Sequence, residues 1–250
     1  MPRFKLKVEY DGGNFVGWQR QKNGPSIQQA LEEAVFALTG EKTEVVGAGR
    51  TDSGVHAMSM VAHIDLKTKR FNSETIKKAL NYHLGEKPIS VLESTLANSD
   101  FHARFSATNR IYLYKILNRS APPALETGRV WFIPRRLDNF SMNDAASILI
   151  GKHDFTSFRA KYCQATSAEK TLHKLEVLRI GDEIHINAEA RSFLHHQIRN
   201  IVGTLKLVGE GKWSKEDVRR ILEAKDRSVA GPTAPADGLY FMGADYETSS

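Results

Sequence analysis

The sequence predicts an α+β fold made of two halves, each with the ferredoxin-like order β-α-β-β-α-β. Short stretches of alternating apolar and polar residues, typical of half-buried strands, interleave with stretches whose apolar residues recur at helical spacing. The same order of elements occurs twice, without visible sequence repetition, on either side of a junction at residues 99–109. We therefore divide the chain into an N-terminal half, residues 1–105, and a C-terminal half, residues 106–250.

The N-terminal half opens with a strand, because apolar residues from Phe4 to Tyr10 alternate with charged ones. A loop rich in aromatic and amide residues follows, and Ser26 with Gln29 makes a capping box that starts the first helix. Periodicity and terminating glycines predict the rest of this half: helix 27–39, strand 43–47, strand 58–66, helix 73–84 and strand 89–96.

The C-terminal half repeats this order and starts with an alternating strand at residues 110–118. Gly181 and Asp182 form a turn pair between two strand-like stretches and predict a hairpin. Ser214 with Asp217 caps a late helix. The other elements follow from periodicity: helix 141–150, hairpin strands 172–180 and 183–190, helices 194–208 and 214–224, and strand 239–246.

The composition is ordinary for a soluble globular protein, with 41% hydrophobic and 26% charged residues among 250. The single cysteine, Cys163, excludes an internal disulfide and a multi-cysteine zinc site, and it fits a reducing cytoplasm. We find no signal-peptide pattern and no apolar run near the ~20 residues that a membrane helix needs. A net charge of +6 favours a polyanionic partner.

Residues 46–57 combine an apolar approach, three glycines, one arginine and one carboxylate. Arg50 and Asp52 are two residues apart, so in an extended backbone their side chains leave on the same side. A lone carboxylate beside a cation, on a glycine-rich loop after a strand, suits an ionised nucleophile or base. The alternative is a plain hairpin turn, because Thr-Asp-Ser-Gly is common turn chemistry.

A second candidate segment, Phe-His-Ala-Arg-Phe, lies at the predicted junction. Arg104 stands between Phe101 and Phe105, an arrangement that suits contacts with an RNA phosphate and with an exposed base. The alternative is a buried plug between the halves, with both phenylalanines in the core. Further along, Tyr112 is by itself only an aromatic residue of a strand.

The start of helix 194–208 carries the third candidate group. His195 and His196 are adjacent, so they point to different helix faces, and no acidic residue follows at the spacing of a zinc site. We therefore predict no metal. Arg199 lies one helical turn after His195 and keeps its charge at any working pH. The alternative for Arg199 is an ordinary surface arginine.

Together these motifs resemble those of the tRNA pseudouridine synthase A family, in family order and over nearly the whole chain. They are Arg-Thr-Asp-Ser-Gly-Val-His-Ala at 50–57, Phe-His-Ala-Arg-Phe at 101–105, Asn-Arg-Ile-Tyr-Leu-Tyr at 109–114 and Phe-Leu-His-His-Gln-Ile-Arg-Asn at 193–200. One departure is Ser53, where the family more often has alanine. This exchange of one small residue for another should matter little.

The resemblance implies a role for each of several residues. Asp52 is the catalytic carboxylate, and Arg199 pairs with it and keeps it ionised. Tyr112 stacks on the target base and, together with Leu194, sandwiches the flipped uracil. Arg50 enters the space that the base leaves. The residues implied in tRNA contact are Phe101, His102, Ala103, Arg104 and Phe105.

The implied activity is isomerisation of uridine to pseudouridine in the anticodon stem-loop of tRNA, in a basic catalytic cleft between the halves. The reaction needs no cofactor and no metal, and the target base must first leave its stack. The expected partners are tRNA and a second copy of the chain, because the family forms homodimers. Asp52 could attack C1′ of the ribose, attack C6 of the base, or remove a ribose proton; the sequence does not choose among them.

Two other functions are compatible with parts of the sequence. A non-catalytic RNA-binding protein of two ferredoxin-like modules accounts for the charge and the aromatic residues, but it gives the Asp52 loop no purpose. A glycoside hydrolase needs two carboxylates flanking the scissile bond, and only one is found in the motif loop.

Overall fold

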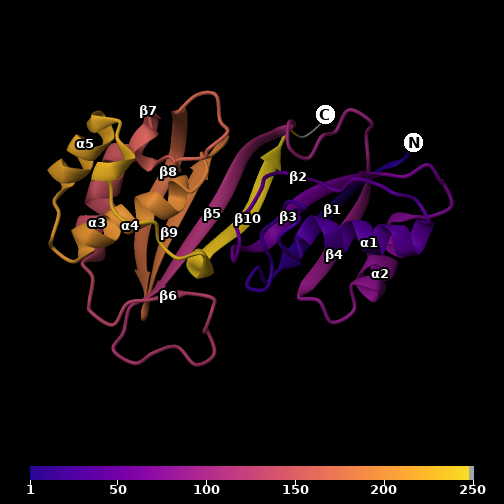
Figure 1. Ribbon diagram of the computed structural model, residues 1–250, viewed down its shortest axis with the longest axis horizontal. Coiled ribbons are helices and arrows are strands. Elements are labelled where there is room, and N and C mark those ends of the chain that lie inside the picture. The colour runs from indigo at the N-terminus through magenta and orange to yellow at the C-terminus, as the bar shows by residue number, and fades with distance from the viewer. Residues whose placement is uncertain (248–250) are drawn as a thin grey trace. The chain divides into compact units, whose positions relative to one another are not determined.

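A computed structural model describes residues 1–247 of the chain (Figure 1). The chain divides into two compact units: the first holds residues 1–108 and the last strand from Tyr240 onward, and the second holds residues 109–239. Each unit combines strands with helices, which confirms the α+β class. The predicted C-terminal half extends to residue 250, and its last residues, 248–250, lie outside the described part.

The first unit is built around strand β3, which pairs with three other strands. β1 pairs with β3 and with β4, both antiparallel, so that β1 lies between them. The other edge of β3 is shared: β2 pairs antiparallel with its late residues, and β10 pairs parallel with its first residues, His56 and Ala57. The elements are β1 (Arg3–Tyr10), α1 (Ile27–Thr39), β2 (Val46–Gly47), β3 (His56–Asp65), α2 (Ser73–Leu84), β4 (Ile89–Ala97) and β10 (Leu239–Tyr246).

Alternation on β1 builds the core of this unit. The residues at even positions, from Phe4 to Tyr10, are buried, and those between them are half-buried. Helices α1 and α2 pack against each other (Figure 1) and bury residues at helical spacing, among them Leu31 and Leu80. The sheet therefore presents one apolar face, which fixes the register of the strands that carry the candidate site.

The second unit is an antiparallel sheet in the order β5-β9-β8-β7, with β6 pairing parallel to the end of β5. Helix α3 packs on β8, and α4 and α5 pack beside α3 (Figure 1). Its strands are β5 (Ala107–Leu117), β6 (Trp131–Phe132), β7 (Gly151–Asp154), β8 (Glu169–Ile180) and β9 (Glu183–Ala190). Its helices are α3 (Asn139–Ala146), α4 (Gln197–Gly209) and α5 (Lys215–Ala224), with short 3₁₀ turns η1 (Ser147–Leu149), η2 (Thr156–Phe158), η3 (Arg227–Val229) and η4 (Ala236–Gly238). No helix within residues 1–247 is long and apolar enough to cross a bilayer.

Most predicted elements are present, and the differences at their ends have local causes. Ser26 caps α1 as predicted, but the Gln29 side chain bonds to Glu33 instead of closing a capping box. Helix α3 starts earlier than predicted, because Asp138 accepts hydrogen bonds from the first backbone N–H groups. Strand β10 is present as predicted, and it pairs parallel with the first residues of β3 in the first unit.

Candidate active site

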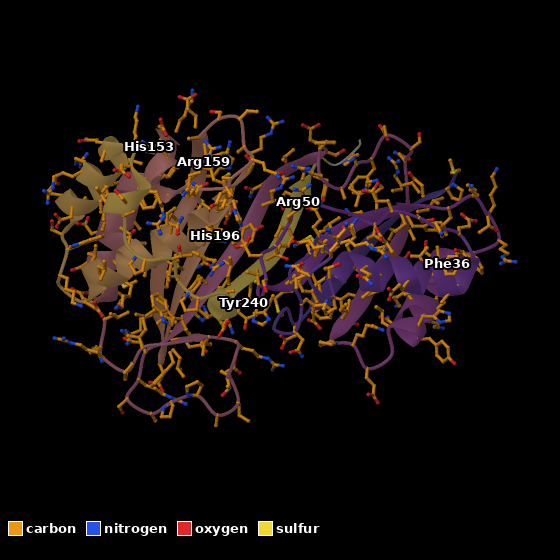
Figure 2. All side chains as sticks on the ribbon, viewed as in Figure 1. Phe36, Arg50, His153, Arg159, His196 and Tyr240 are labelled. Atoms are coloured by element: carbon orange, nitrogen blue, oxygen red, sulfur yellow. The ribbon has the colours of Figure 1, made fainter. Side chains whose placement is uncertain are left out.

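Asp52 lies in the loop that joins β2 to β3. Its backbone oxygen accepts a hydrogen bond from Val55 N at 3.2 Å, which closes a tight turn. Gly54 occupies this turn with φ 81°, a conformation that glycine adopts without strain. Asp52 is half-buried, Thr51 before it is buried, and Arg50 is exposed (Figure 2). The loop therefore contains a tight turn, as the alternative interpretation predicted. It also presents a carboxylate and a cation from one short segment.

The loop between β1 and α1 fixes the backbone of the Asp52 loop. Trp18 N donates to the Thr51 carbonyl oxygen at 3.0 Å, and the Ser53 hydroxyl donates to the Phe15 carbonyl oxygen at 3.1 Å. Gly17 has φ 107°, and a Cβ there would lie 2.5 Å from the Thr51 carbonyl oxygen. Only glycine fits such an approach. The residues on both sides of Asp52 are thus held from outside the motif.

Two buried side chains add to this support. The Tyr10 hydroxyl lies 2.8 Å from the Thr51 hydroxyl. His56 Nδ1 accepts a hydrogen bond from Gly12 N at 3.1 Å, and the His56 ring stacks on Tyr240 with centroids 4.9 Å apart. Sequence reasoning assigned neither Tyr10 nor His56 a place in the site. The sequence placed Tyr10 and Gly12 at the end of a strand, but it did not show that they contact Thr51 and His56, about 40 residues further along the chain.

The segment 101–105 is half anchored and half exposed. Ala103 is fully buried: its N–H donates to His63 Nδ1 at 3.2 Å, and its carbonyl oxygen accepts from the Tyr246 hydroxyl at 2.7 Å. Phe105, by contrast, is 72% exposed, and the Arg104 guanidinium lies 5.6 Å from its ring centre. Arg104 and Phe105 are therefore presented to solvent on a fixed backbone.

Phe101 and His102 act inside this segment. The Phe101 ring lies 5.0 Å from that of Tyr246, and Lys5 approaches both rings. His102 Nδ1 accepts from the backbone N–H groups of Arg104 and Phe105. Both side chains hold the segment in shape. The interpretation of Phe105 as core is wrong, whereas Phe101 is half-buried.

His63 is the anchor of this segment, and its charge state matters. Burial, aided by the nearby Arg3 guanidinium, lowers the pKa of His63 from 6.5 to about 4. Arg3 is itself held by Asp65 at 2.8 and 2.6 Å, and these bonds lower the pKa of the Asp65 carboxyl. A neutral His63 keeps the lone pair that accepts from Ala103 N–H.

Tyr112 lies on β5 opposite Ala188 of β9 and is half-buried. The ring of Phe193 meets it edge-on, with centroids 5.2 Å apart and planes at 82°. Two residues further, and hence on the same face of the strand, Tyr114 is fully buried and donates to the Pro235 carbonyl oxygen at 2.8 Å. Burial raises the pKa of the Tyr114 hydroxyl, so it stays protonated.

The start of α4 differs from the prediction, because the helix begins at Gln197 and not at residue 194. His196 (Figure 2), the residue directly before the helix, has φ 62°, and this left-handed conformation separates residues 194–195 from the helix. Gln197 holds both polar backbone groups of Leu194: its side-chain oxygen accepts from Leu194 N at 2.8 Å, and its N–H donates to the Leu194 oxygen at 3.0 Å. Leu194 is thereby buried and fixed at the helix start.

Arg199 lies in the first turn of α4 and is half-buried. Its Nε donates to the Ala234 carbonyl oxygen at 2.8 Å, while Ala234 N donates to the Arg199 oxygen at 3.0 Å. The guanidinium also acts on the Tyr114 hydroxyl, whose pKa it lowers against the larger effect of burial. Arg199 is therefore held at a defined place and is not a freely moving surface residue.

The predicted site residues fall into three groups. Arg50 and Asp52 share one loop of the first unit, and Tyr112, Leu194 and Arg199 belong to the second unit. The segment 101–105 is anchored on β3 at His63, seven residues after the Asp52 loop ends at His56, or about 23 Å along an extended strand. Within the first unit, the structure does not bring that anchor to Asp52.

Comparison with known proteins identifies the family of the chain. The sequence pattern of the family described as tRNA pseudouridine synthase matches residues 7–106 and 145–247. A protein of Rhodospirillum rubrum named tRNA pseudouridine synthase A is 59% identical over 97% of this chain and 87% of its own length. Proteins of the same name from Rhodospirillum centenum and Rhizobium meliloti are 58% and 56% identical, each over 98% of this chain and 100% of their own. The family match covers most of the chain and the identity extends over nearly all of it, so the chain belongs to the tRNA pseudouridine synthase family.

Proposed function

We propose that this protein isomerises uridine to pseudouridine in the anticodon stem-loop of tRNA, with Asp52 as the essential carboxylate. The observation that carries this proposal is the half-buried Asp52 on a loop whose backbone is fixed from both sides by the Phe15–Trp18 region. The isomerisation involves no redox step, and the group that it needs is a fixed carboxylate that acts as a nucleophile or a base. The relatives' name supplies the substrate class, tRNA.

The reaction breaks the bond between ribose C1′ and N1 of uracil, turns the base over and joins C1′ to C5. The C5 hydrogen leaves as a proton and N1 gains one, so neither an oxidant nor a group donor is consumed. A carboxylate can serve as the nucleophile at C1′ or C6, or as the base that removes a ribose proton. All three routes need Asp52 ionised.

The other predicted residues receive proposed roles on this basis. Tyr112 and Leu194 contact the two faces of the flipped uracil, and Arg50 enters the vacated stack. Arg199 keeps Asp52 ionised, a role that suits a guanidinium because it stays charged. Arg104 and Phe105 contact the RNA backbone and a base, which their exposure and fixed backbone support.

We further propose that both units are ferredoxin-like and that RNA binds in a basic cleft associated with them. The order β4-β1-β3-β2 in the first unit, with β3 antiparallel to β1 and to β2, supports the ferredoxin-like assignment there. The net charge of +6 supports a basic RNA surface.

We also propose a homodimer in the cytoplasm, where tRNA is found. The second unit supplies a surface for a second copy: α3 packs on β8, and the opposite side of that strand leaves Leu178 41% and Ile180 56% exposed. Exposed apolar side chains on a sheet face contribute to many dimer surfaces.

Release of tritium from a tRNA transcript labelled at C5 of uridine tests the proposed activity. The wild-type protein should release tritium with multiple turnovers, because C5 loses its hydrogen only when the new bond forms. The competing candidate, an RNA-binding protein without catalysis, would bind the same transcript and release none. RNA binding measured in parallel therefore separates the two functions.

A further inference from the structure

The loop at residues 159–165 in the second unit is folded around one arginine side chain. The Arg159 guanidinium (Figure 2) donates to the carbonyl oxygens of Cys163 at 2.8 Å and Ala165 at 2.5 Å. Cys163 N donates to the Ala160 carbonyl oxygen at 3.1 Å and closes a turn between them. An arginine that binds two carbonyl groups of its own loop fixes the path of the backbone.

This loop docks on the segment that precedes α4. Ala160 N donates to the His195 carbonyl oxygen at 3.0 Å, and His195 N donates to the Cys163 sulfur at 3.4 Å. Both polar backbone groups of His195 are thus bound by the loop. Cys163 and His195 are in contact through this last bond, and each follows directly on a residue of interest, Tyr162 and Leu194 respectively. The tip of the loop therefore lies beside Leu194, the proposed uracil contact.

Tyr162 is the residue that this loop displays. It is 82% exposed, although a tyrosine ring is mostly apolar and gains free energy by burial. The neighbouring Lys161 is also exposed, with its amine 5.8 Å from the ring centre, and within residues 1–247 it makes no ion pair. An aromatic ring with an adjacent cation, on a backbone clamped in place, is the arrangement that binds unpaired bases and their phosphates.

We propose that Tyr162 and Lys161 form a further RNA contact beside the active site. The Tyr162 ring stacks on an unpaired base that neighbours the target uridine, and Lys161 neutralises a phosphate next to that base. The ligand is a nucleobase with a free face, and a purine fits better than a pyrimidine because its stacking area is larger. The proposal rests on the proposed function, since it takes Leu194 to mark the position of the target.

Binding to an unmodified tRNA transcript and to anticodon stem-loops that carry a purine or a pyrimidine beside the target tests this contact. Tyr162→Ala should weaken binding by roughly tenfold, within the range of base–aromatic stacking, and should abolish the preference for the purine. Tyr162→Phe keeps the ring face and should bind as the wild type does. Lys161→Ala should lower the slope of log affinity against log salt by about 0.7, the loss of one single-strand phosphate contact.

Tyr82→Ala is the matched control. Tyr82 is 81% exposed on α2 in the first unit, so its removal changes surface area by the same amount without touching this loop. Wild-type affinity and an unchanged purine preference in Tyr162→Ala would overturn the proposal, as would an equal loss in Tyr82→Ala. Tritium release by the wild type is read separately: its absence would overturn the proposed function, whereas the binding data alone decide the role of Tyr162.

Discussion

The hydroxyl oxygens of Tyr10 and Thr51 lie 2.8 Å apart in the interior of the first unit. Tyr10 is the last residue of β1, and Thr51 directly precedes Asp52. This one hydrogen bond therefore ties the end of a central strand to the backbone that carries the proposed catalytic carboxylate.

Tyr10→Phe should lower the turnover rate several-fold with little change in KM. The phenyl ring keeps the packing, but the Thr51 hydroxyl loses its buried partner, at about 1 kcal/mol of unfolding free energy. Denaturant unfolding and steady-state kinetics measure the two effects. A double-mutant cycle with Thr51→Val isolates the pair: if Tyr10→Phe costs as much in that background as in the wild type, the bond does not act on Asp52.

Asp52→Asn should abolish isomerisation and leave tRNA binding largely intact. The amide has the same shape as the carboxylate but can act neither as a nucleophile nor as a base under these conditions. Tritium release and filter binding with the same transcript measure the two properties. Glu44→Gln, an exposed carboxylate just before β2, is the control and should behave as the wild type. Substantial turnover by Asp52→Asn would remove Asp52 from its proposed role.

Tyr112→Phe and Tyr112→Ala should separate stacking from proton transfer. Phenylalanine keeps the ring that meets Phe193, whereas alanine removes it and forfeits roughly 1–3 kcal/mol of base stacking. Normal binding without turnover in Tyr112→Phe would assign the hydroxyl to the movement of a proton. If both variants turn over normally once saturated with RNA, Tyr112 serves only to bind the base.

Arg199→Lys should keep part of the activity, and Arg199→Leu should lose nearly all of it. A carboxylate without its cation takes up a proton more readily, so the acid limb of the pH–rate profile should move to higher pH in the leucine variant. The lysine variant keeps a charge but loses the Nε bond to Ala234. An acid limb that stays in place in Arg199→Leu would show that Arg199 acts only through the structure of α4.

The first unit should lose stability as the pH falls from 6.5 toward 4. The pKa of His63 is about 4 in the folded protein and 6.5 by its ordinary value, because burial and Arg3 disfavour the charged ring. In that window the unfolded chain binds more protons, so the stabilisation is complete above pH 6.5 and is lost on acidification. His63→Asn should flatten the dependence of unfolding free energy on pH, which denaturant unfolding at a series of pH values measures.

Much of the fold follows from local pattern. The helix at residues 27–39 and the capped helix from Ser214 were predictable, because their caps and apolar spacing lie within the elements themselves. Strand β2 was predicted too long, since Val45 N donates to the Glu32 side chain on α1 and leaves the ladder. That contact joins residues of two elements and has no signature in either.

The site shows the same division. Asp52 could be found because the whole run Arg-Thr-Asp-Ser-Gly-Val-His-Ala at 50–57 resembles a family motif, whereas Asp-Ser-Gly by itself is common turn chemistry. Tyr10, His63 and Gln197 could not, because each acts through a partner far along the chain or through a backbone group. The predicted start of α4 was wrong for the same reason. The Gln197 side chain bonds to the backbone of Leu194, and the spacing of apolar residues does not reveal such a bond.

The strand β10 can pair with β3 only late in synthesis, because the two strands are far apart in the sequence. Residues 109–239 leave the ribosome before Tyr240, so the second unit is available in full while the edge of β3 at His56 still lacks its neighbour. The Tyr240 ring that stacks on His56 is therefore synthesised after the whole of the second unit. A chain cut short before Tyr240 would hold every predicted site residue and still lack the strand that pairs with β3 where the Asp52 loop ends.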